Sequence, residues 1–315
     1  MAADCKDKLM SNSPFGLDNA AEYATWRERK LDAAPRRIED IVVTLDDPRA
    51  LTGDELAALL DRCATTNMAI YTSNTVGDGD KEIPRRLGMQ LGLAHLDSHW
   101  LTDDDAISPI SVRGAEERGE RKEFIPYTDK PIRWHTDGYY NLPERTVRGM
   151  ILHCVQSAQT GGDSQLLDHE IAYILLRDKN PDHIRALMRP DVMTIPPRMD
   201  DSGIARAAQP GPVFSIDGAG FLHMRYTART ISIEWRDDAA TRDAVAELTR
   251  ILATPTPWTL HGRLEPGMGL VCNNVLHDRS GFTETPERRR LLYRARYHER
   301  VAARTTSESI LNRPL

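Results

Sequence analysis

The stretch PERRRLLYRARYHER, residues 286–300, has the clearest two-residue alternation in the chain. Side chains two positions apart on a β-strand lie on the same face, so this period predicts a strand. One face would carry Leu292 together with three arginines, Arg290, Arg294 and Arg296. If that face points inward, the guanidinium groups need anionic partners, because an unpaired buried charge is costly. If it points outward, the arginines form a solvated edge.

Upstream of this strand, from residue 130 onward, the sequence is divided into short strand-like runs. These runs are VRGMILHCV, SQLLD, VMTI, PVFSI, GFLHMRY, PWTLHGRL and MGLVCNN. The segment IDGAGF (216–221) places Asp-Gly between two of them and predicts a hairpin. Many short strands separated by turns predict an antiparallel β core of the sandwich or barrel kind.

Helical patterns occupy the N-terminal third and interrupt the strand region twice. They cover residues 17–34, 52–67, 82–93, 169–188 and 237–254. The second pattern begins with Thr52 as a plausible N-cap and has Glu55 three residues later, which is the capping-box arrangement. We expect these helices to pack on the outside of the β core, giving a mainly β protein with flanking helices.

The bulk properties exclude several classes of protein. A chain of 315 residues suits one large domain or two modest ones, and we expect a loose leader over 1–16 followed by a single domain over 17–315. The net charge of −6 argues against a nucleic-acid partner. No apolar run approaches the ~20 residues that span a membrane. The four cysteines form no Cys-x-x-Cys pair and no secretory signal is visible, so we expect free thiols and a cytoplasmic location.

The heptapeptide WHTDGYY (134–140) carries two potential metal ligands two positions apart. On a strand, His135 and Asp137 would face the same side and could both bind one divalent cation. His277, which follows the run EPGMGLVCNNVL, is the candidate for a third ligand. Two histidines and one carboxylate form the facial triad of non-haem iron sites. The motif is also common by chance, and zinc binds the same residue types.

The segment TGGDSQLLD (160–168) lies one strand and one turn beyond the heptapeptide. Its paired glycines allow an unusual backbone, and Ser164 presents a hydroxyl at the start of a strand. The alternative is a plain turn.

Taken together, the H-x-D motif, the G-G-D-S segment and a distal histidine followed thirteen residues later by Arg290 resemble a known family. They are similar to the Fe(II)- and 2-oxoglutarate-dependent dioxygenases of the taurine dioxygenase family, and the nearest branch looks like the γ-butyrobetaine hydroxylases. The resemblance covers roughly residues 50–300. It implies a double-stranded β-helix, or jelly roll, of the clavaminate synthase-like kind. A homodimer or homotetramer is common in this family.

The resemblance also implies the cofactors and the residues that bind them. Fe(II) would be bound by the metal triad, with 2-oxoglutarate and O2 as cosubstrates that yield succinate and CO2. The assigned residues are His135, Asp137 and His277 for the metal, and Arg290, Ser164 and Arg294 for 2-oxoglutarate. Halogenases of this superfamily carry a small residue in place of the carboxylate, so the presence of Asp137 makes halogenation unexpected.

The expected substrate is a small polar, anionic metabolite. Tyr127 matches one wall of the aromatic cage with which the γ-butyrobetaine branch holds a trimethylammonium group, but Arg296 occupies the cage position on the last strand. Arginines there favour an anion over a cation. Tyr139 and Arg225 are further candidates for lining the substrate pocket. The cysteine cluster that would support that branch's zinc-binding N-terminal domain is also missing from the sequence.

Two other classes of function remain open on the sequence. A non-catalytic jelly-roll module could bind a metabolite or a metal as a sensor. A zinc hydrolase could use the same three ligands, but it would not need an anion site at Arg290.

Overall fold

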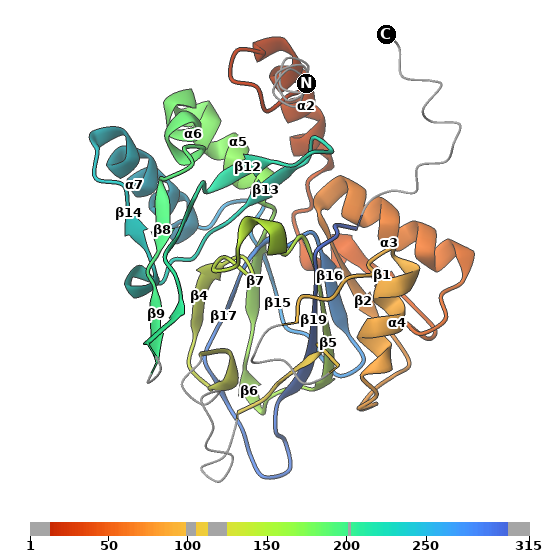
Figure 1. The fold of residues 1–315 in the computed structure, drawn as a ribbon. Coiled ribbons are helices and arrows are strands. Elements are labelled where there is room, and N and C mark those ends of the chain that lie inside the picture. Colours follow the sequence, from red (N-terminus) through yellow and green to blue (C-terminus); the bar gives the residue numbers. More distant parts are fainter. Residues whose placement is uncertain (1–12, 99–104, 113–124, 201–202, 302–315) are drawn as a thin grey trace.

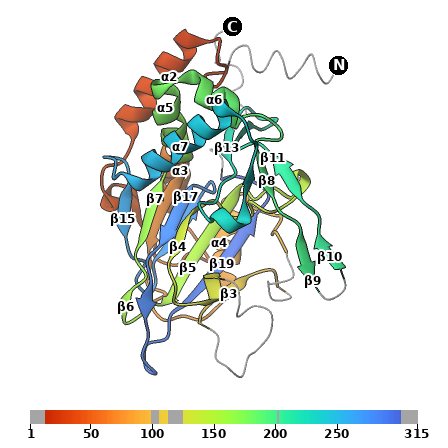
Figure 2. The same cartoon turned by 90° about the vertical axis from the view of Figure 1, so that its left-hand side faces the viewer.

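The computed structural model describes residues 13–98, 105–112, 125–200 and 203–301, and its centre is a pair of β-sheets (Figures 1 and 2). Six strands form the larger sheet in the order β1-β2-β16-β5-β19-β3. In that order their bounds are Val42–Thr44, Met68–Thr72, Gly269–Cys272, Gly149–Gln156, Leu291–Tyr297 and Ser108–Ile110. Within this sheet β1 and β2 are parallel, and the other neighbouring strands are antiparallel.

Four strands form the smaller sheet in the order β15-β7-β17-β4. Their bounds are Leu260–Gly262, Ser164–Leu167, Leu276–Arg279 and Ile132–His135. A buried apolar cluster joins the two sheets: Met68 and Leu270 come from the larger one, and Leu166 and Leu260 from the smaller one. The inner faces of the sheets therefore share one core, whose rim carries the candidate site.

Shorter strands extend this core at its ends. β8, β11 and β14 form a three-stranded sheet, and three pairs are made by β9 with β10, β12 with β13, and β6 with β18. Their bounds, in chain order from β6, are Thr160–Gly161, Met193–Ile195, Arg198–Asp200, Gly203–Arg206, Gln209–Gly211, Phe214–Ile216, Leu222–Met224, Glu234–Trp235 and Phe282–Thr283. The predicted hairpin at IDGAGF is confirmed as the β12–β13 pair.

Helices cover the sheets from two sides (Figure 1). They are α2 (Ala20–Ala33), α3 (Gly53–Thr66), α4 (Glu82–Gln90), α5 (His169–Lys179), α6 (Pro181–Leu187) and α7 (Ala239–Ala253). α3 and α4 bury Leu59 and Leu87 against Tyr71 and Ala295 of the larger sheet. α5, α6 and α7 form a second core with β8, β12 and β13. Among the described residues, no helix is both long enough and apolar enough to cross a bilayer.

The expected combination of a β core and flanking helices is confirmed. Within the described residues the two sheets remain separate and do not close into one barrel. The single helical insertion expected over 169–188 is divided into α5 and α6 at Asn180, because Pro181 has no N–H with which to continue α5 and the Asn180 side chain caps the new helix.

The loose leader expected over 1–16 lies outside the described residues up to residue 12. From residue 13 onward the expectation is wrong. Arg177 of α5 donates hydrogen bonds to the carbonyls of Pro14 and Gly16 at 2.8 and 3.0 Å. Phe15 between them is 5% exposed and packs edge-on against Trp26 of α2. A single buried aromatic ring, supported by these hydrogen bonds, fixes the segment.

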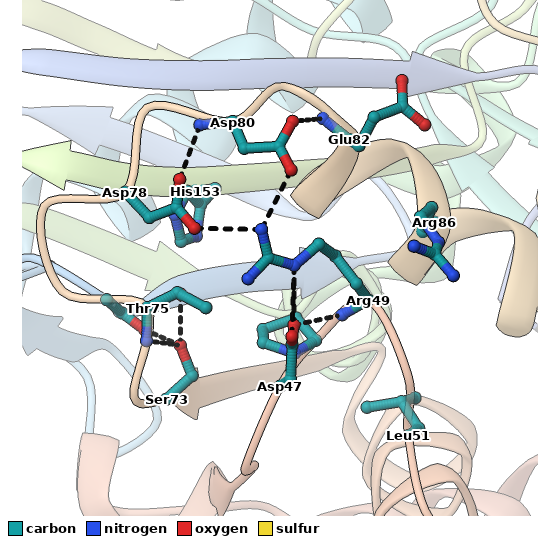
Figure 3. Close-up of polar contacts among 12 residues, drawn as sticks. Asp47, Arg49, Leu51, Ser73, Thr75, Asp78, Asp80, Glu82, Arg86 and His153 are labelled. Carbon is teal, nitrogen blue, oxygen red and sulfur yellow. Dashed lines mark hydrogen bonds and ion pairs between the residues drawn. The ribbon is translucent and has the colours of Figure 1, made fainter.

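An arginine-centred cluster fixes the start of α4 (Figure 3). The Arg49 guanidinium contacts Asp47 at 3.0 Å and both Asp78 and Asp80 at 2.9 Å. Asp80 also accepts a hydrogen bond from the backbone N–H of Glu82 in the first turn of α4. The turn after β1 is thereby tied to the loop after β2, which holds α4 over the outer face of the larger sheet.

The capping box predicted at the start of α3 is confirmed. The Thr52 hydroxyl accepts from the Glu55 N–H at 3.3 Å, and the Glu55 carboxylate accepts from the Thr52 N–H at 2.7 Å. We expect Thr52→Ala to lower the free energy of unfolding by about 1 kcal/mol in urea titrations, because the first turn loses a partner for one N–H group. Thr249→Ala, an exposed position inside α7, is the matched control and should not destabilise the protein. Equal losses in the two variants would argue against the cap.

Candidate active site

Two histidines from neighbouring strands form the centre of the site. β4 and β17 are antiparallel, and His277 stands directly opposite His135 in their register. Opposite residues of an antiparallel pair project to the same side, and the two imidazole rings lie with their centroids 4.2 Å apart. His277, the candidate third ligand, therefore lies beside His135, and the sheet that carries both is open.

Each histidine has one ring nitrogen fixed by the backbone. His135 Nδ1 lies 3.0 Å from the carbonyl oxygen of Arg133, and His277 Nδ1 lies 3.0 Å from that of Val275. A carbonyl oxygen only accepts, so both Nδ1 atoms carry the proton. In the neutral imidazole this tautomer leaves Nε2 free to bind a metal, which is the usual orientation of histidine ligands.

Asp137 reaches the same point from a turn. β4 ends at His135, so the expectation that His135 and Asp137 share one strand face is wrong. Asn274 supplies the missing constraint: its side-chain oxygen accepts from the Asp137 N–H at 2.7 Å, and its NH2 group donates to the Asp137 carbonyl at 2.9 Å. Asn274 has a φ of 51°, a left-handed conformation that asparagine tolerates better than most residues. One Asp137 carboxylate oxygen lies 3.8 Å from His135 Nε2.

These three side chains fit a divalent metal ion. One donor atom from each of His135, Asp137 and His277 lies within 4.8 Å of the others, and the residues are 8%, 6% and 9% exposed. Burial lowers the pKa of His135 to about 3, which keeps it in the neutral form that binds metals. Burial opposes ionisation of Asp137, but Arg294 and Arg296 hold its pKa below the usual range. Its Oδ2 atom is buried and accepts no hydrogen bond, although Arg294 Nη1 lies 3.2 Å away as an ion-pair partner, so the oxygen retains a lone pair for a metal ion.

The arginine face of β19 points inward, so the first of the two sequence alternatives is confirmed. Arg290 and Arg296 are 8% and 3% exposed. Leu292, which lies between them in the sequence, is also buried. Arg294 places one guanidinium nitrogen 3.2 Å from each oxygen of Asp137. The same strand thus faces the metal site through Arg294.

Arg290 lies in a pocket with the other residue predicted to bind 2-oxoglutarate. The pocket is lined by Arg290, Ser164, Leu152, Leu292, Gly162 and Arg263 among others. Arg263 contacts Glu265 at 3.0 Å, whereas one NH2 group of Arg290 is buried without a partner. Burial lowers the pKa of Arg290 to about 10, so it stays cationic near neutral pH. A buried, unmatched guanidinium with a hydroxyl on the same pocket wall fits one carboxylate of a small diacid.

Arg296 already has an anionic partner. Its guanidinium lies 2.6 Å from Asp97 and donates to the Tyr140 hydroxyl at 2.9 Å. Asp97 has no exposed side-chain surface, so the pair is fully buried. The positive charge expected to attract a substrate anion is therefore neutralised inside the protein, by a residue 199 positions away in the sequence.

The other predicted substrate residues differ in their surroundings. Tyr127 is 1% exposed and packs with Ile110, Cys154 and Leu292, so it presents no surface to a substrate here. Arg225 donates to three backbone carbonyls, those of Tyr139, Met193 and Gln209. These contacts give Arg225 a structural role. Tyr139 is half-buried and follows Asp137 by two residues in the sequence. Its ring packs edge-on against that of Tyr140, with the two centroids 5.2 Å apart.

Comparison with known proteins agrees with this geometry. The chain matches the taurine catabolism dioxygenase TauD, TfdA family over residues 35–296. A uridine-5′-phosphate dioxygenase from an Amycolatopsis species is 35% identical over 176 residues, which are 53% of this chain and 60% of that protein. A second, from a Streptomyces species, is 27% identical over 202 residues, 61% of this chain and 69% of its own length. A solved asparagine oxygenase in complex with Fe(II), 3-hydroxyasparagine and succinate has a TM-score of 0.54 at 14% identity and covers 78% of each chain.

The structural likeness defines the fold as that of the Fe- and 2-oxoglutarate-dependent oxygenases. The family match is more specific and extends over most of the sequence, so the chain belongs to the taurine catabolism dioxygenase TauD, TfdA family. The expected family is thereby confirmed. Its assignment to the γ-butyrobetaine branch stays a prediction, since the two curated relatives described above are uridine-5′-phosphate dioxygenases.

Proposed function

We propose that this chain is an Fe(II)- and 2-oxoglutarate-dependent dioxygenase that oxidises, most simply by hydroxylation, a nucleoside 5′-phosphate. Uridine 5′-phosphate is the first substrate to test. The observation that carries the proposal is the buried set of His135, Asp137 and His277 beside the Arg290 pocket, in a chain 35% identical over its aligned part to a uridine-5′-phosphate dioxygenase. A nucleotide also satisfies the expectation of a small, polar, anionic substrate.

Each residue of the site has a distinct role in this proposal. His135, Asp137 and His277 bind the iron, and Arg290 with Ser164 binds the distal carboxylate of 2-oxoglutarate. The bound iron and 2-oxoglutarate supply the oxidising power drawn from O2, with succinate and CO2 as coproducts. Arg294 keeps Asp137 ionised and holds its carboxylate between the two histidines. Burial of the whole set excludes bulk water from the reacting atoms.

The broader expectations belong to the same proposal. The two sheets correspond to a double-stranded β-helix of the clavaminate synthase-like kind, within one domain that includes the packed residues from 13 onward. Cys63, Cys154 and Cys272 are buried free thiols, which suits the reducing environment of a cytoplasmic protein. A homodimer or homotetramer is the expected assembly.

The direct test is substrate-dependent turnover. The protein would be purified anaerobically, reconstituted with Fe(II) and supplied with 2-oxoglutarate, O2 and one candidate substrate at a time. We expect succinate to form in step with oxidised product when uridine 5′-phosphate is present, and much less with uridine or taurine. Formation of succinate at the same rate with and without uridine 5′-phosphate would reject the nucleotide as substrate.

The proposed role of Ser164 leads to a smaller, separate prediction. Ser164→Ala should raise the KM for 2-oxoglutarate by about two- to tenfold, which corresponds to the ~0.5–1.5 kcal/mol of one ordinary hydrogen bond. The kcat should change little, because the serine does not touch the metal. Ser215→Ala on β12, outside the pocket, is the control. An unchanged KM would remove Ser164 from the cosubstrate site.

A further inference from the structure

A second group of arginines lies near the metal site, outside the pocket of Arg290. Arg206 is the last residue of β10, and Arg198 is the first residue of β9. The two are directly opposite in the register of this antiparallel pair. Opposite residues project to the same side of a hairpin, and like charges in that position repel each other. Two arginines eight positions apart give no periodic signal, so this pair is not visible in the sequence.

Arg206 has an incompletely matched guanidinium. One NH2 group donates to the Pro196 carbonyl at 2.8 Å, whereas the Nε–H group is buried without a hydrogen-bond partner. No carboxylate in the described part of the chain forms an ion pair with Arg206 or with its neighbour Arg225. Burial lowers the pKa of both arginines, and the charge of Arg206 lowers that of Arg225 further, to about 10. Within the described residues, the charges of Arg206 and Arg225 are therefore not neutralised by an ion pair.

The arginine group is connected to the metal site through one aromatic ring. The Arg206 guanidinium carbon lies 5.8 Å from the centroid of the Tyr140 ring, and that of Arg296 lies 5.9 Å from the same centroid. Tyr140 follows the metal-binding Asp137 by three residues. A substrate that reaches from Arg206 past Tyr140 would therefore extend toward the metal.

We propose that Arg206, at the end of β10, binds the phosphate group of the substrate. The proposal rests on the proposed function, in which the substrate is a nucleoside 5′-phosphate. The unmatched Nε–H of Arg206 is one arm of the fork with which arginine binds oxyanions, and the neighbouring charge of Arg225 favours a dianion at this position. The edge-on pair of Tyr139 and Tyr140 beside Arg206 offers aromatic faces to the nucleoside. Arg290 is thereby left for 2-oxoglutarate.

The test compares ligands with and without the phosphate. Binding of uridine 5′-phosphate and of uridine would be measured by calorimetry on protein loaded with Mn(II) and N-oxalylglycine, so that no turnover occurs. Wild type should bind the nucleotide at least about tenfold more tightly than the nucleoside. Arg206→Ala should abolish most of the preference for the nucleotide, because it weakens nucleotide binding and leaves uridine binding unchanged. Arg206→Lys should retain part of that preference. Arg242→Ala, an exposed arginine on α7, should leave the ratio unchanged.

The outcomes separate the two proposals. If wild type prefers the nucleotide but both Arg206→Ala and the uncharged, polar Arg206→Gln keep the full preference, the phosphate site is elsewhere, and the proposed function stands. If wild type binds the nucleotide no better than uridine, the nucleotide substrate itself is wrong and the subsite fails with it. Equal thermal unfolding of wild type and both variants would show that the hairpin remains folded.

Discussion

Asp137→Ala is expected to abolish tight Fe(II) binding and, with it, succinate formation from 2-oxoglutarate. The substitution removes one of three ligands from a site in which the other two are neutral imidazoles. It also leaves Arg294 buried without the carboxylate that lies 3.2 Å from it. Loss of a residue that only orients a ligand costs ~10–100-fold in metal affinity, so loss of the ligand itself should exceed that range. Anaerobic equilibrium dialysis with Fe(II) measures binding, and a succinate assay measures turnover.

A matched control separates metal binding from general damage. Asp54→Ala removes an exposed carboxylate in the first turn of α3 and should retain wild-type metal content and turnover. Unchanged circular dichroism of Asp137→Ala would show that its fold is intact. Stoichiometric iron and near-wild-type succinate formation in Asp137→Ala would reject the triad. Activity with zinc and without 2-oxoglutarate would instead favour the hydrolase considered on the sequence alone.

Local periodicity is sufficient to predict β19 and the shared face of its arginines. A strand has a fixed two-residue repeat, which Leu292, Arg294 and Arg296 of β19 follow, and Arg290, just before the strand, lines the same pocket as Leu292. The capping box of α3 is equally local, because its two partners are three residues apart. Both predictions depend on neighbours in the sequence, and the structure confirms both.

Contacts between distant residues could not be predicted in the same way. The orientation of Asp137 depends on Asn274, which is 137 positions away, and the partner of Arg296 is Asp97, 199 positions away. No spacing rule connects such residues, since their proximity follows from the pairing of whole strands. The only local signal for Asn274 is its occurrence three residues before His277, in a pair of asparagines that tolerate turn conformations. The role assigned to Arg296 on the sequence fails for this reason.

Arg290→Ala is expected to raise the KM for 2-oxoglutarate by roughly ten- to a hundredfold, as follows from ~1.5–3 kcal/mol for hydrogen bonds to a charged group. Arg290 is 8% exposed and has an unmatched NH2 group, so its only suitable partner in the pocket is an anionic ligand. The kcat at saturating 2-oxoglutarate should fall less than kcat/KM, because the guanidinium contacts the end of the cosubstrate away from the metal. Arg289→Ala is a close control, since the neighbouring side chain is exposed and does not line the pocket. A large KM effect for Arg289→Ala and none for Arg290→Ala would mean that Arg289, one residue earlier, binds 2-oxoglutarate. Equal KM values for both variants and wild type would mean that 2-oxoglutarate binds outside the Arg290 pocket.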